Sequence, residues 1–183
     1  MRVANHPRGG RPCHGRGLGR RRPLCQGRSV RRCHVDWVEK GHRLMAYWLF
    51  KSEPDVWGWD QQTAKGAVGE EWGGVRNYQA RNNMRAMKTG DLGFFYHSRT
   101  GLEIVGIVEV CTESHPDSTT DDPRWDCVDV RAVRPFVKPV SLAQIKADLR
   151  LKDMVLVNNA RLSVQPVTDT EWKTICALGG IEP

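Results

Sequence analysis

The 183-residue sequence lacks most of the features that assign a function directly. No apolar run approaches the roughly 20 residues of a membrane-spanning helix, and the Arg-rich start has no apolar stretch typical of secretory signals. The chain also lacks a phosphate-binding loop, a Gly-x-Ser-x-Gly elbow and a zinc-deaminase signature. These absences argue against membrane, nucleotide-hydrolysing and α/β-hydrolase classes. We therefore expect no membrane partner, no cofactor, no metal and no catalytic residue.

Cysteine is too sparse and too scattered for a disulfide framework. Three of the six cysteines lie within residues 1–44, and the other three (Cys111, Cys127 and Cys176) lie far apart among apolar neighbours. An odd number of dispersed thiols is typical of reduced, buried cysteines. We therefore expect a cytoplasmic protein in a reducing compartment.

Positive charge is missing from most of the chain, although the whole carries a formal charge of +7. Residues 1–44 hold twelve Lys and Arg against two acids, whereas residues 45–183 hold sixteen basic against nineteen acidic residues. A mildly acidic domain is a poor non-specific phosphate binder, because that mode of binding needs many cationic contacts. The high sequence pI is therefore no guide to the properties of residues 45–183.

Residues 1–44 are rich in Arg, Gly and Pro and have no hydrophobic period. Such a segment buries too little apolar surface to fold alone, so we expect a disordered basic extension. It could be an arm that contacts nucleic acid, an organelle transit peptide, or sequence added by an upstream start site. We favour the start-site artefact, because Met45 follows and opens the first strand. The cysteines and histidines of this segment lack the spacing of a zinc knuckle.

Residues 45–183 alternate between short strand-like and helix-like patterns. Ser141 is a plausible N-cap, and Thr168 with Glu171 forms a capping box before an amphipathic run. The order predicts an α+β domain on a curled, mostly antiparallel sheet. The expected strands are 46–50, 91–97, 102–111, 125–133 and 154–157, and the expected helices begin near Pro54 and cover about 78–88, 142–149 and 172–178.

Four strings in this region resemble the EVE-domain family: YWLFKSEPDVWGWD, WGGVRNYQARNNMRAMKTGDLGFFYHS, IVGIVEV and HPD. The resemblance covers essentially all of residues 45–183, and its long second block is highly specific. It implies a PUA-like, mostly antiparallel β-barrel with peripheral helices, related to readers of methylated adenosine. Such domains hold a small ligand or an extruded base in a pocket, and EVE domains look like readers of modified bases in DNA or RNA.

A pocket for a modified base needs aromatic walls and directed polar groups. Trp72 is the best aromatic candidate, because it lies in a Gly-rich loop where periodicity does not explain it. Ser52 and Asn77 could equally cap helices, and His97 could be a satisfied residue at a strand edge. The candidate pocket residues are Lys51, Ser52, Glu53, Trp72, Asn77, Tyr78, Tyr96, His97 and Ser98.

One face of the expected helix at 78–88 carries a basic stripe. Arg81, Arg85 and Lys88 have helical spacing, and Arg76 lies just upstream. We interpret the four as phosphate contacts beside the pocket. The alternative is an ordinary solvated face whose charges pair with nearby acids.

The leading hypothesis is a non-catalytic module that recognises a modified nucleobase in DNA or RNA. A second is a small hydrolase of the PUA/ASCH-like type acting on a modified base or nucleoside, in which Lys51 and Glu53 supply the reacting pair. A third is a protein-interaction module. Modified nucleic acid is the expected partner.

Overall fold

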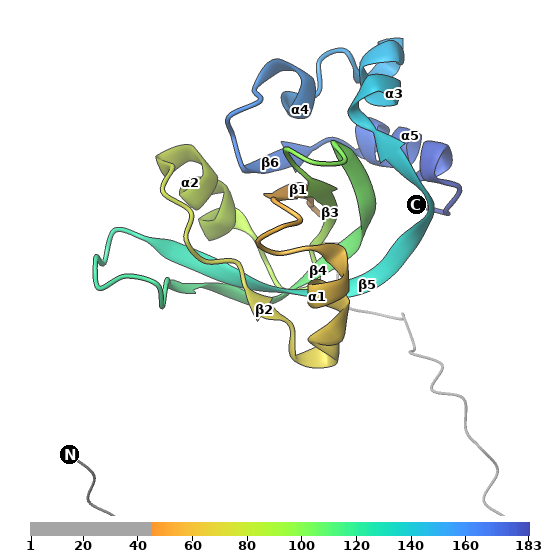
Figure 1. Ribbon diagram of the computed structural model, residues 1–183. Coiled ribbons are helices and arrows are strands. Elements are labelled where there is room, and N and C mark those ends of the chain that lie inside the picture. The colour runs from red at the N-terminus through yellow and green to blue at the C-terminus, as the bar shows by residue number, and fades with distance from the viewer. Residues whose placement is uncertain (1–44) are drawn as a thin grey trace, which may run out of the picture. The chain divides into compact units, whose positions relative to one another are not determined.

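The computed structural model describes residues 45–183, and the predictions made for residues 1–44 lie outside the described residues. Figure 1 shows the arrangement of the elements in the described part. In chain order they are β1 (Tyr47–Ser52), α1 (Trp59–Ala64), η1 (Gly66–Val68), β2 (Glu70–Glu71), α2 (Tyr78–Ala86), β3 (Leu92–His97), β4 (Glu103–Pro116), β5 (Asp126–Ser141), α3 (Leu142–Ala147), η2 (Leu149–Leu151), α4 (Val155–Asn158), β6 (Val164–Val167) and α5 (Asp169–Gly179).

The six strands form one sheet in the order β2-β5-β4-β3-β1-β6. β1 and β3 run parallel, and the other neighbouring pairs are antiparallel. β4 and β5 are long and curve around the other strands (Figure 1), and the register between them shifts at four places. Such irregularities increase the local bend and twist of a strand pair. The predicted α+β class with a curled, mostly antiparallel sheet is confirmed.

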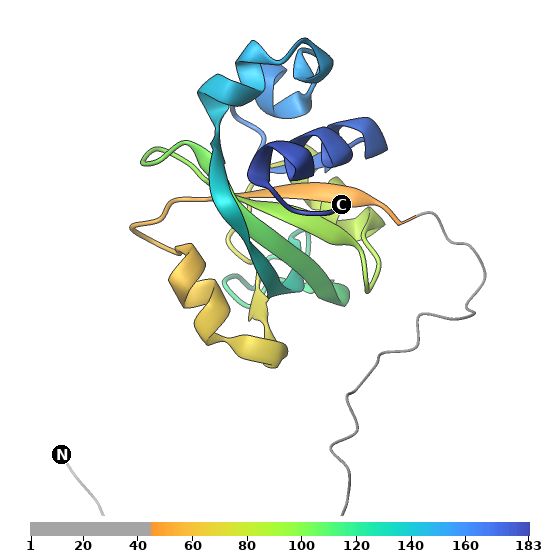
Figure 2. The same cartoon turned by 90° about the vertical axis from the view of Figure 1, so that its right-hand side faces the viewer.

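Both faces of the sheet are packed with apolar side chains. Alternation along β1 sends Leu49 to one buried cluster and Phe50 to the other, and β3 divides Phe94 and Phe95 in the same way. On the first face Trp172 of α5 stacks on Phe94, with ring centroids 4.2 Å apart. Figure 2 shows α5 lying across this face of the sheet.

The second face is covered by α2 and by the chain that precedes it. Ala80, Met84 and Met87, which are spaced four and three residues apart, are fully buried in this cluster. Asn77 caps α2, its side-chain oxygen accepting a hydrogen bond from Ala80 N at 3.0 Å. The rest of the cover is irregular backbone around Trp72, and the site described below lies beside it.

Several predicted helix boundaries are confirmed, and two predictions are wrong. Ser141 caps α3, and the capping box at Thr168 opens α5. The helix expected near Pro54 begins only at Trp59, because a turn occupies the intervening residues. The run 154–157 is not a strand, and residues 155–158 form α4. A four-residue apolar run does not distinguish a strand from a buried helix.

Two strands differ from the prediction because they contain proline: β6 was missed, and β5 is longer than expected. β6 was not predicted, and it carries Pro166 on an edge strand. β5 continues through Pro135 and Pro139, beyond the short segment paired with β2. Proline is tolerated where the N–H side of a strand is unpaired, so it does not end a strand there. No helix among residues 45–183 is long and apolar enough to cross a bilayer.

Candidate functional site

A cavity of about 660 Å³ opens at the end of β1, between the turn that follows this strand and the loop that follows β2. Its volume lies within the range of small-ligand sites, roughly 300–1,000 Å³. Four separate segments of the chain build it. The lining residues are Lys51, Ser52, Glu53, Val56, Trp57, Glu70, Glu71, Trp72, Gly73, Gly74, Val75, Arg76, Ser118, Thr119 and Ser163.

Two tryptophans form the aromatic part of the lining. Trp72 is 8% exposed, and its ring meets Phe50 and Phe95 edge to face at 5.1 and 5.6 Å. Trp57 is half-buried, and its indole N–H donates to Gln62 Oε1 at 2.8 Å. Both rings are therefore held in place before any ligand arrives, which favours stacking.

Lys51 supplies positive charge at the end of β1. Its ammonium donates to the carbonyl of Ala160 at 3.1 Å and lies 5.9 Å from the ring of Tyr96. Burial lowers the pKa of the Lys51 ammonium. An ammonium has three protons to donate, so the single hydrogen bond to Ala160 leaves donors for a ligand.

Glu71, the last residue of β2, supplies negative charge to the lining. Its Oε1 accepts from Ser118 N at 2.7 Å and from the Cys127 thiol at 3.2 Å. Burial alone would raise the pKa of the Glu71 carboxyl, but the hydrogen bonds from Ser118 and Cys127 and the positive potential of His115 lower it. The group is therefore an ionised acceptor at the cavity wall.

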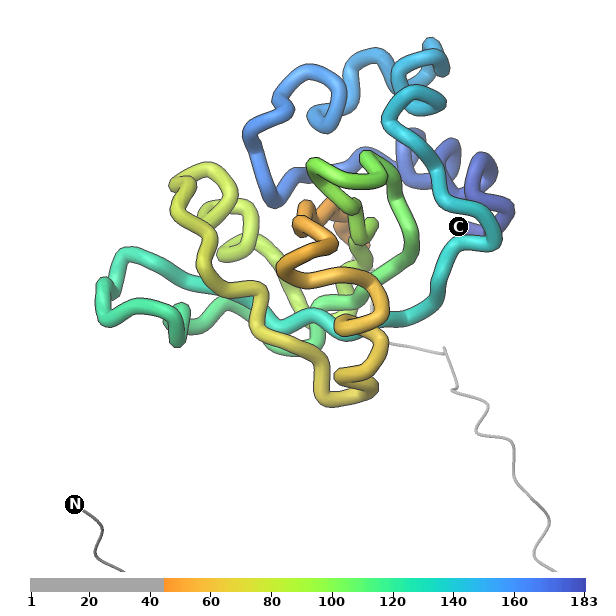
Figure 3. The backbone as a smooth tube through the Cα atoms, in the orientation of Figure 1, coloured from red at the N-terminus to blue at the C-terminus, as the bar shows by residue number. Residues whose placement is uncertain are grey.

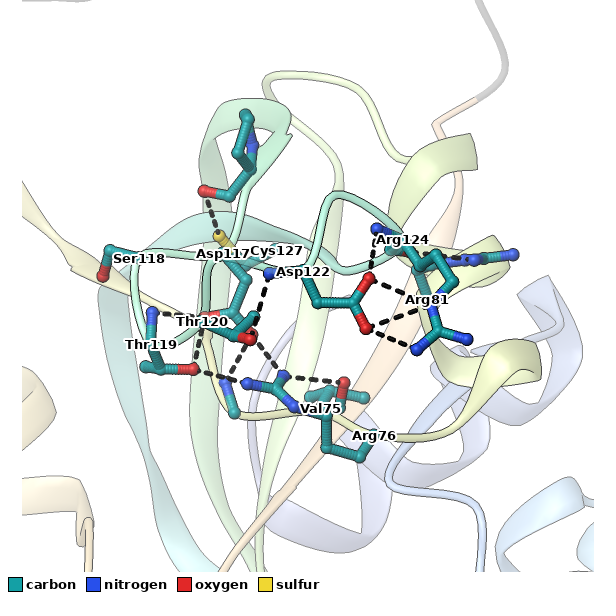
Figure 4. Close-up of polar contacts among 12 residues, drawn as sticks. Val75, Arg76, Arg81, Asp117, Ser118, Thr119, Thr120, Asp122, Arg124 and Cys127 are labelled. Atoms are coloured by element: carbon teal, nitrogen blue, oxygen red, sulfur yellow. Dashed lines mark hydrogen bonds and ion pairs between the residues drawn. The ribbon is translucent and has the colours of Figure 1, made fainter.

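Asp117 fastens the two loops that flank the cavity (Figure 4). Its Oδ2 accepts from Gly74 N at 2.9 Å and from Arg76 Nη1 at 2.5 Å, and its Oδ1 accepts from the amide and hydroxyl of Thr119. Burial opposes ionisation, but the bonds from Thr119 and Arg76 outweigh it and hold the pKa of Asp117 at about 2. A Cβ on Gly73 would lie 2.9 Å from Asp117 Oδ1, so this close approach requires glycine.

Five of the predicted ligand and phosphate residues meet in the cavity: Lys51, Ser52, Glu53, Trp72 and Arg76. Ser52 is partly committed, because its hydroxyl donates to the carbonyl of Trp57 at 2.6 Å. Glu53 forms an ion pair with Arg99 at 2.9 Å.

The remaining predicted pocket residues do not line this cavity, and their contact with a ligand stays a prediction. Asn77 is the cap of α2, and Tyr78 lies on the surface beyond it. Tyr96 is 2% exposed in the core. His97 Nε2 accepts from Trp59 N at 3.2 Å, and burial lowers the pKa of its imidazole. Ser98 donates from its hydroxyl to the Ser52 carbonyl at 3.0 Å.

The basic stripe of α2 is largely paired with acids. Arg85 bonds to Asp126, and Lys88 bonds to Glu113 at 2.8 Å. Arg81 differs, because it forms no ion pair within residues 45–183 and its guanidinium donates to the carbonyl of Arg124 at 2.8 Å. The alternative interpretation of a paired helix face therefore fits Arg85 and Lys88 better than it fits Arg81.

Sequence reasoning missed the contribution of the loop between β4 and β5. Ser118 and Thr119 line the cavity, and Asp117 holds them there. The only signal was the HPD string within the resemblance, because these contacts join segments more than 40 residues apart. Glu71 was also missed, because two consecutive glutamates before Trp72 have no distinctive spacing.

A cysteine, a histidine and an aspartate, residue types that can form a nucleophilic catalytic site, lie together next to Glu71. His115 Nε2 is 3.0 Å from Asp129 Oδ1, and its Nδ1 is 3.5 Å from the sulfur of Cys127. Cys127 is fully buried, and burial together with the Glu71 carboxylate raises the pKa of its thiol. A reactive cysteine needs the opposite environment, exposed and electropositive. Residues 45–183 contain no group of three or more His, Cys, Asp or Glu placed to hold a metal ion.

Together, a curled sheet, flanking helices and an aromatic-walled cavity define a PUA-like domain. Residues 46–178 match the EVE domain family, and this chain belongs to that family. It is 37% identical over 181 residues to thymocyte nuclear protein 1 of Mus musculus, covering 78% of this chain and 77% of that protein.

Solved structures give the same result. A protein of Agrobacterium tumefaciens is 63% identical, with a TM-score of 0.74 over 74% of this chain and 94% of that one. The human THYN1 protein, solved in complex with 5-methylcytosine-containing DNA, is 35% identical. Its TM-score is 0.68, over 75% of this chain and 99% of that one.

Proposed function

We propose that this protein is a non-catalytic reader of a modified nucleobase, and that the base enters the cavity at the end of β1. The observation that carries the proposal is a cavity of about 660 Å³ with two fixed tryptophans, an ammonium and a carboxylate in its lining. Aromatic walls suit the flat faces of a base, since stacking contributes about 1–3 kcal/mol per base.

The two charged groups fit a base edge that carries both donors and acceptors. Glu71 offers a carboxylate oxygen of the kind that accepts from the exocyclic amino group of cytosine. Lys51 offers protons to a ring carbonyl or ring nitrogen. A base lacking either feature would lose a hydrogen bond to a charged group, which contributes about 1.5–3 kcal/mol.

A modified cytosine is the form of ligand we favour. It combines the amino group and the carbonyl that Glu71 and Lys51 would pair with, and the human THYN1 protein was solved with DNA containing 5-methylcytosine. The apolar side chains of Val56 and Val75 in the lining would accommodate a methyl group.

Binding without turnover is favoured by how the reactive groups are engaged. The hydrolase hypothesis requires Lys51 and Glu53 to act together. Each is engaged elsewhere, because Glu53 forms an ion pair with Arg99 and Lys51 donates a hydrogen bond to the carbonyl of Ala160. Cys127 is buried, and this burial raises the pKa of its thiol and so disfavours the reactive thiolate. Neither arrangement provides the set of nucleophile, base and orienting group that catalysis needs.

The test is a binding screen of the full chain against short DNA and RNA strands that differ only in one base, unmodified, methylated or hydroxymethylated. Fluorescence anisotropy measures affinity, and mass spectrometry then weighs each strand. The basic segment at 1–44 affects all strands alike, so the ratio between modified and unmodified strands is the measurement. We expect at least tenfold selectivity and unchanged mass.

Glu71→Gln should remove most of that selectivity, whereas Glu109→Gln, on β4 outside the cavity, should leave it intact. A change in the mass of an oligonucleotide after incubation would show turnover and would favour the hydrolase hypothesis. Equal affinity for all strands would defeat the reader proposal and leave the interaction module.

A further inference from the structure

An exposed pair of aromatic rings lies next to the cavity. Tyr78, the first residue of α2, stacks on Trp125, which precedes β5, with ring centroids 5.0 Å apart and planes at 26°. Figure 3 shows the loop that joins β4 and β5 projecting beside α2. Tyr78 is 53% exposed, and Trp125 is half-buried. An interaction that served only to brace the loop would gain more from burying the tyrosine ring.

Three guanidinium groups surround this pair. That of Arg81 lies 4.9 Å from the centroid of Tyr78 and 6.0 Å from that of Trp125, and that of Arg76 lies 5.5 Å from Trp125. Arg124 Nη1 approaches the Tyr78 hydroxyl at 3.5 Å. We call Tyr78, Trp125 and Arg81 the stacking platform.

Two of the three arginines around the platform form ion pairs, and the third does not within residues 45–183. Arg76 pairs with Asp117, and Arg124 pairs with Asp122 at 2.6 Å, as Figure 4 shows. Arg81 has no carboxylate partner within residues 45–183, so one positive charge remains unmatched beside the rings. An anion that arrives at the platform therefore meets a guanidinium that has no ion pair, in a domain that is acidic as a whole.

The platform and the cavity share a wall. Arg76 lines the cavity and lies over Trp125. Ser118 and Thr119 line the cavity from the same loop that ends at Trp125. The platform is therefore adjacent to the cavity, on the other side of Arg76.

Aromatic rings with interleaved arginines are the means by which proteins hold unpaired nucleotides. We propose that the stacking platform is a second nucleotide subsite, which stacks a base next to the one in the cavity while Arg81 neutralises the phosphate between them. The inference rests on the proposed function, and it adds that the ligand is a locally unpaired strand of at least two nucleotides. The isolated nucleoside would use the cavity alone.

The experiment compares two ligands of the full chain, the free modified nucleoside and a single strand of about eight nucleotides that carries it. Calorimetry measures the affinity of each ligand. Tyr78→Ala and Arg81→Ala should each weaken strand binding about tenfold and leave nucleoside binding unchanged. Tyr78→Phe should restore strand binding because it keeps the ring. Arg150→Ala removes an arginine from η2, away from both sites, and is the matched control.

Equal loss of nucleoside and strand affinity in Tyr78→Ala would show that the ring only supports the cavity, and would overturn the inference. Wild-type strand affinity in both alanine variants would also overturn it. Failure of the proposed function looks different, because the wild type would then bind modified and unmodified strands equally. Tyr78→Ala would still decide the inference through its effect on strand affinity.

Discussion

The two faces of the sheet are equally apolar but differ in what covers them. Phe94 on one face and Phe95 on the other are both fully buried. The first face is covered by α5, whose Trp172 stacks on the sheet. The second is covered partly by α2 and partly by the loop around Trp72, which the carboxylate of Asp117 holds down. Helical cover packs apolar side chains against the first face, whereas loop cover brings polar groups to the edge of a buried aromatic ring.

The largest expected effect is on the helix-covered face. Trp172→Ala should lower the free energy of unfolding by about 3–5 kcal/mol, because it removes a fully buried ring stacked on Phe94 and Tyr47. Trp172→Phe is the control, since the indole N–H has no hydrogen-bond partner in the described part of the chain and its loss removes none. Denaturant unfolding measures both. If Trp172→Ala lowered the free energy of unfolding by much less, Trp172 would not be the main support of the helix-covered face.

The second prediction concerns the loop cover of the other face. Asp117→Asn turns an acceptor into a donor opposite Gly74 N–H and Arg76, and should cost about 1–3 kcal/mol of stability. Thermal unfolding measures this loss. Ligand affinity should fall as well, because the same bonds shape the cavity wall. If Asp117→Asn were destabilised but bound the ligand with unchanged affinity, the bonds of Asp117 would not be needed to shape the binding site.

The same carboxylate predicts an acid dependence. Its pKa is lowered in the folded state from 3.8 to about 2, so its contribution to stability is complete above pH 3.8 and is lost as the pH falls towards 2. Asp117→Asn should flatten the stability profile in this window. A steep profile that persists in the variant would assign the acid sensitivity to other carboxylates.

The third prediction separates binding from stability. Lys51→Met should weaken binding of the modified strand by about 10- to 150-fold, because hydrogen bonds with a charged partner contribute about 1.5–3 kcal/mol. Burial lowers the pKa of Lys51, so wild-type affinity should fall as the pH rises through that lowered value. The variant should lack this fall. Stability should change little, since the substitution also removes a half-buried charge.

The smallest effect belongs to His115. Burial opposes its protonation, but Asp129 and the Pro116 carbonyl outweigh burial and raise the pKa of the imidazole. The stability that protonation provides is present below the unfolded value of 6.5 and is lost as the pH rises through the folded pKa. Because the pair is partly exposed, His115→Gln should cost less than about 1 kcal/mol at acidic pH. An equal cost above the folded pKa would contradict an ionic contribution.

Local signals in the sequence were enough to predict much of the fold. The short apolar runs of β1 and β3, the 3–4 spacing of Ala80, Met84 and Met87, and the capping box before α5 each act within a few residues. β6 could not be predicted, because its partner β1 lies more than 100 residues away and Pro166 disguises it.

The candidate site was less predictable for the same physical reason. Lys51, Ser52 and Glu53 follow a strand end, where polar groups gather, and Trp72 stood out from its glycine neighbours. Asp117 looked like one acid among several in a polar loop. Its importance comes from burial and from Gly74 and Arg76, which only the folded chain brings to it.

β1 has a position in the sheet that bears on synthesis of the protein. It lies between β3 and β6, and its pairing with Val164–Val167 requires nearly the whole domain to have left the ribosome. Trp48, Leu49 and Phe50 are fully or almost fully buried in the finished protein, yet they are among the first residues of the described domain to be translated. This strand therefore waits longest of the described strands for its second neighbour, and its apolar side chains remain incompletely covered until β6 has been made.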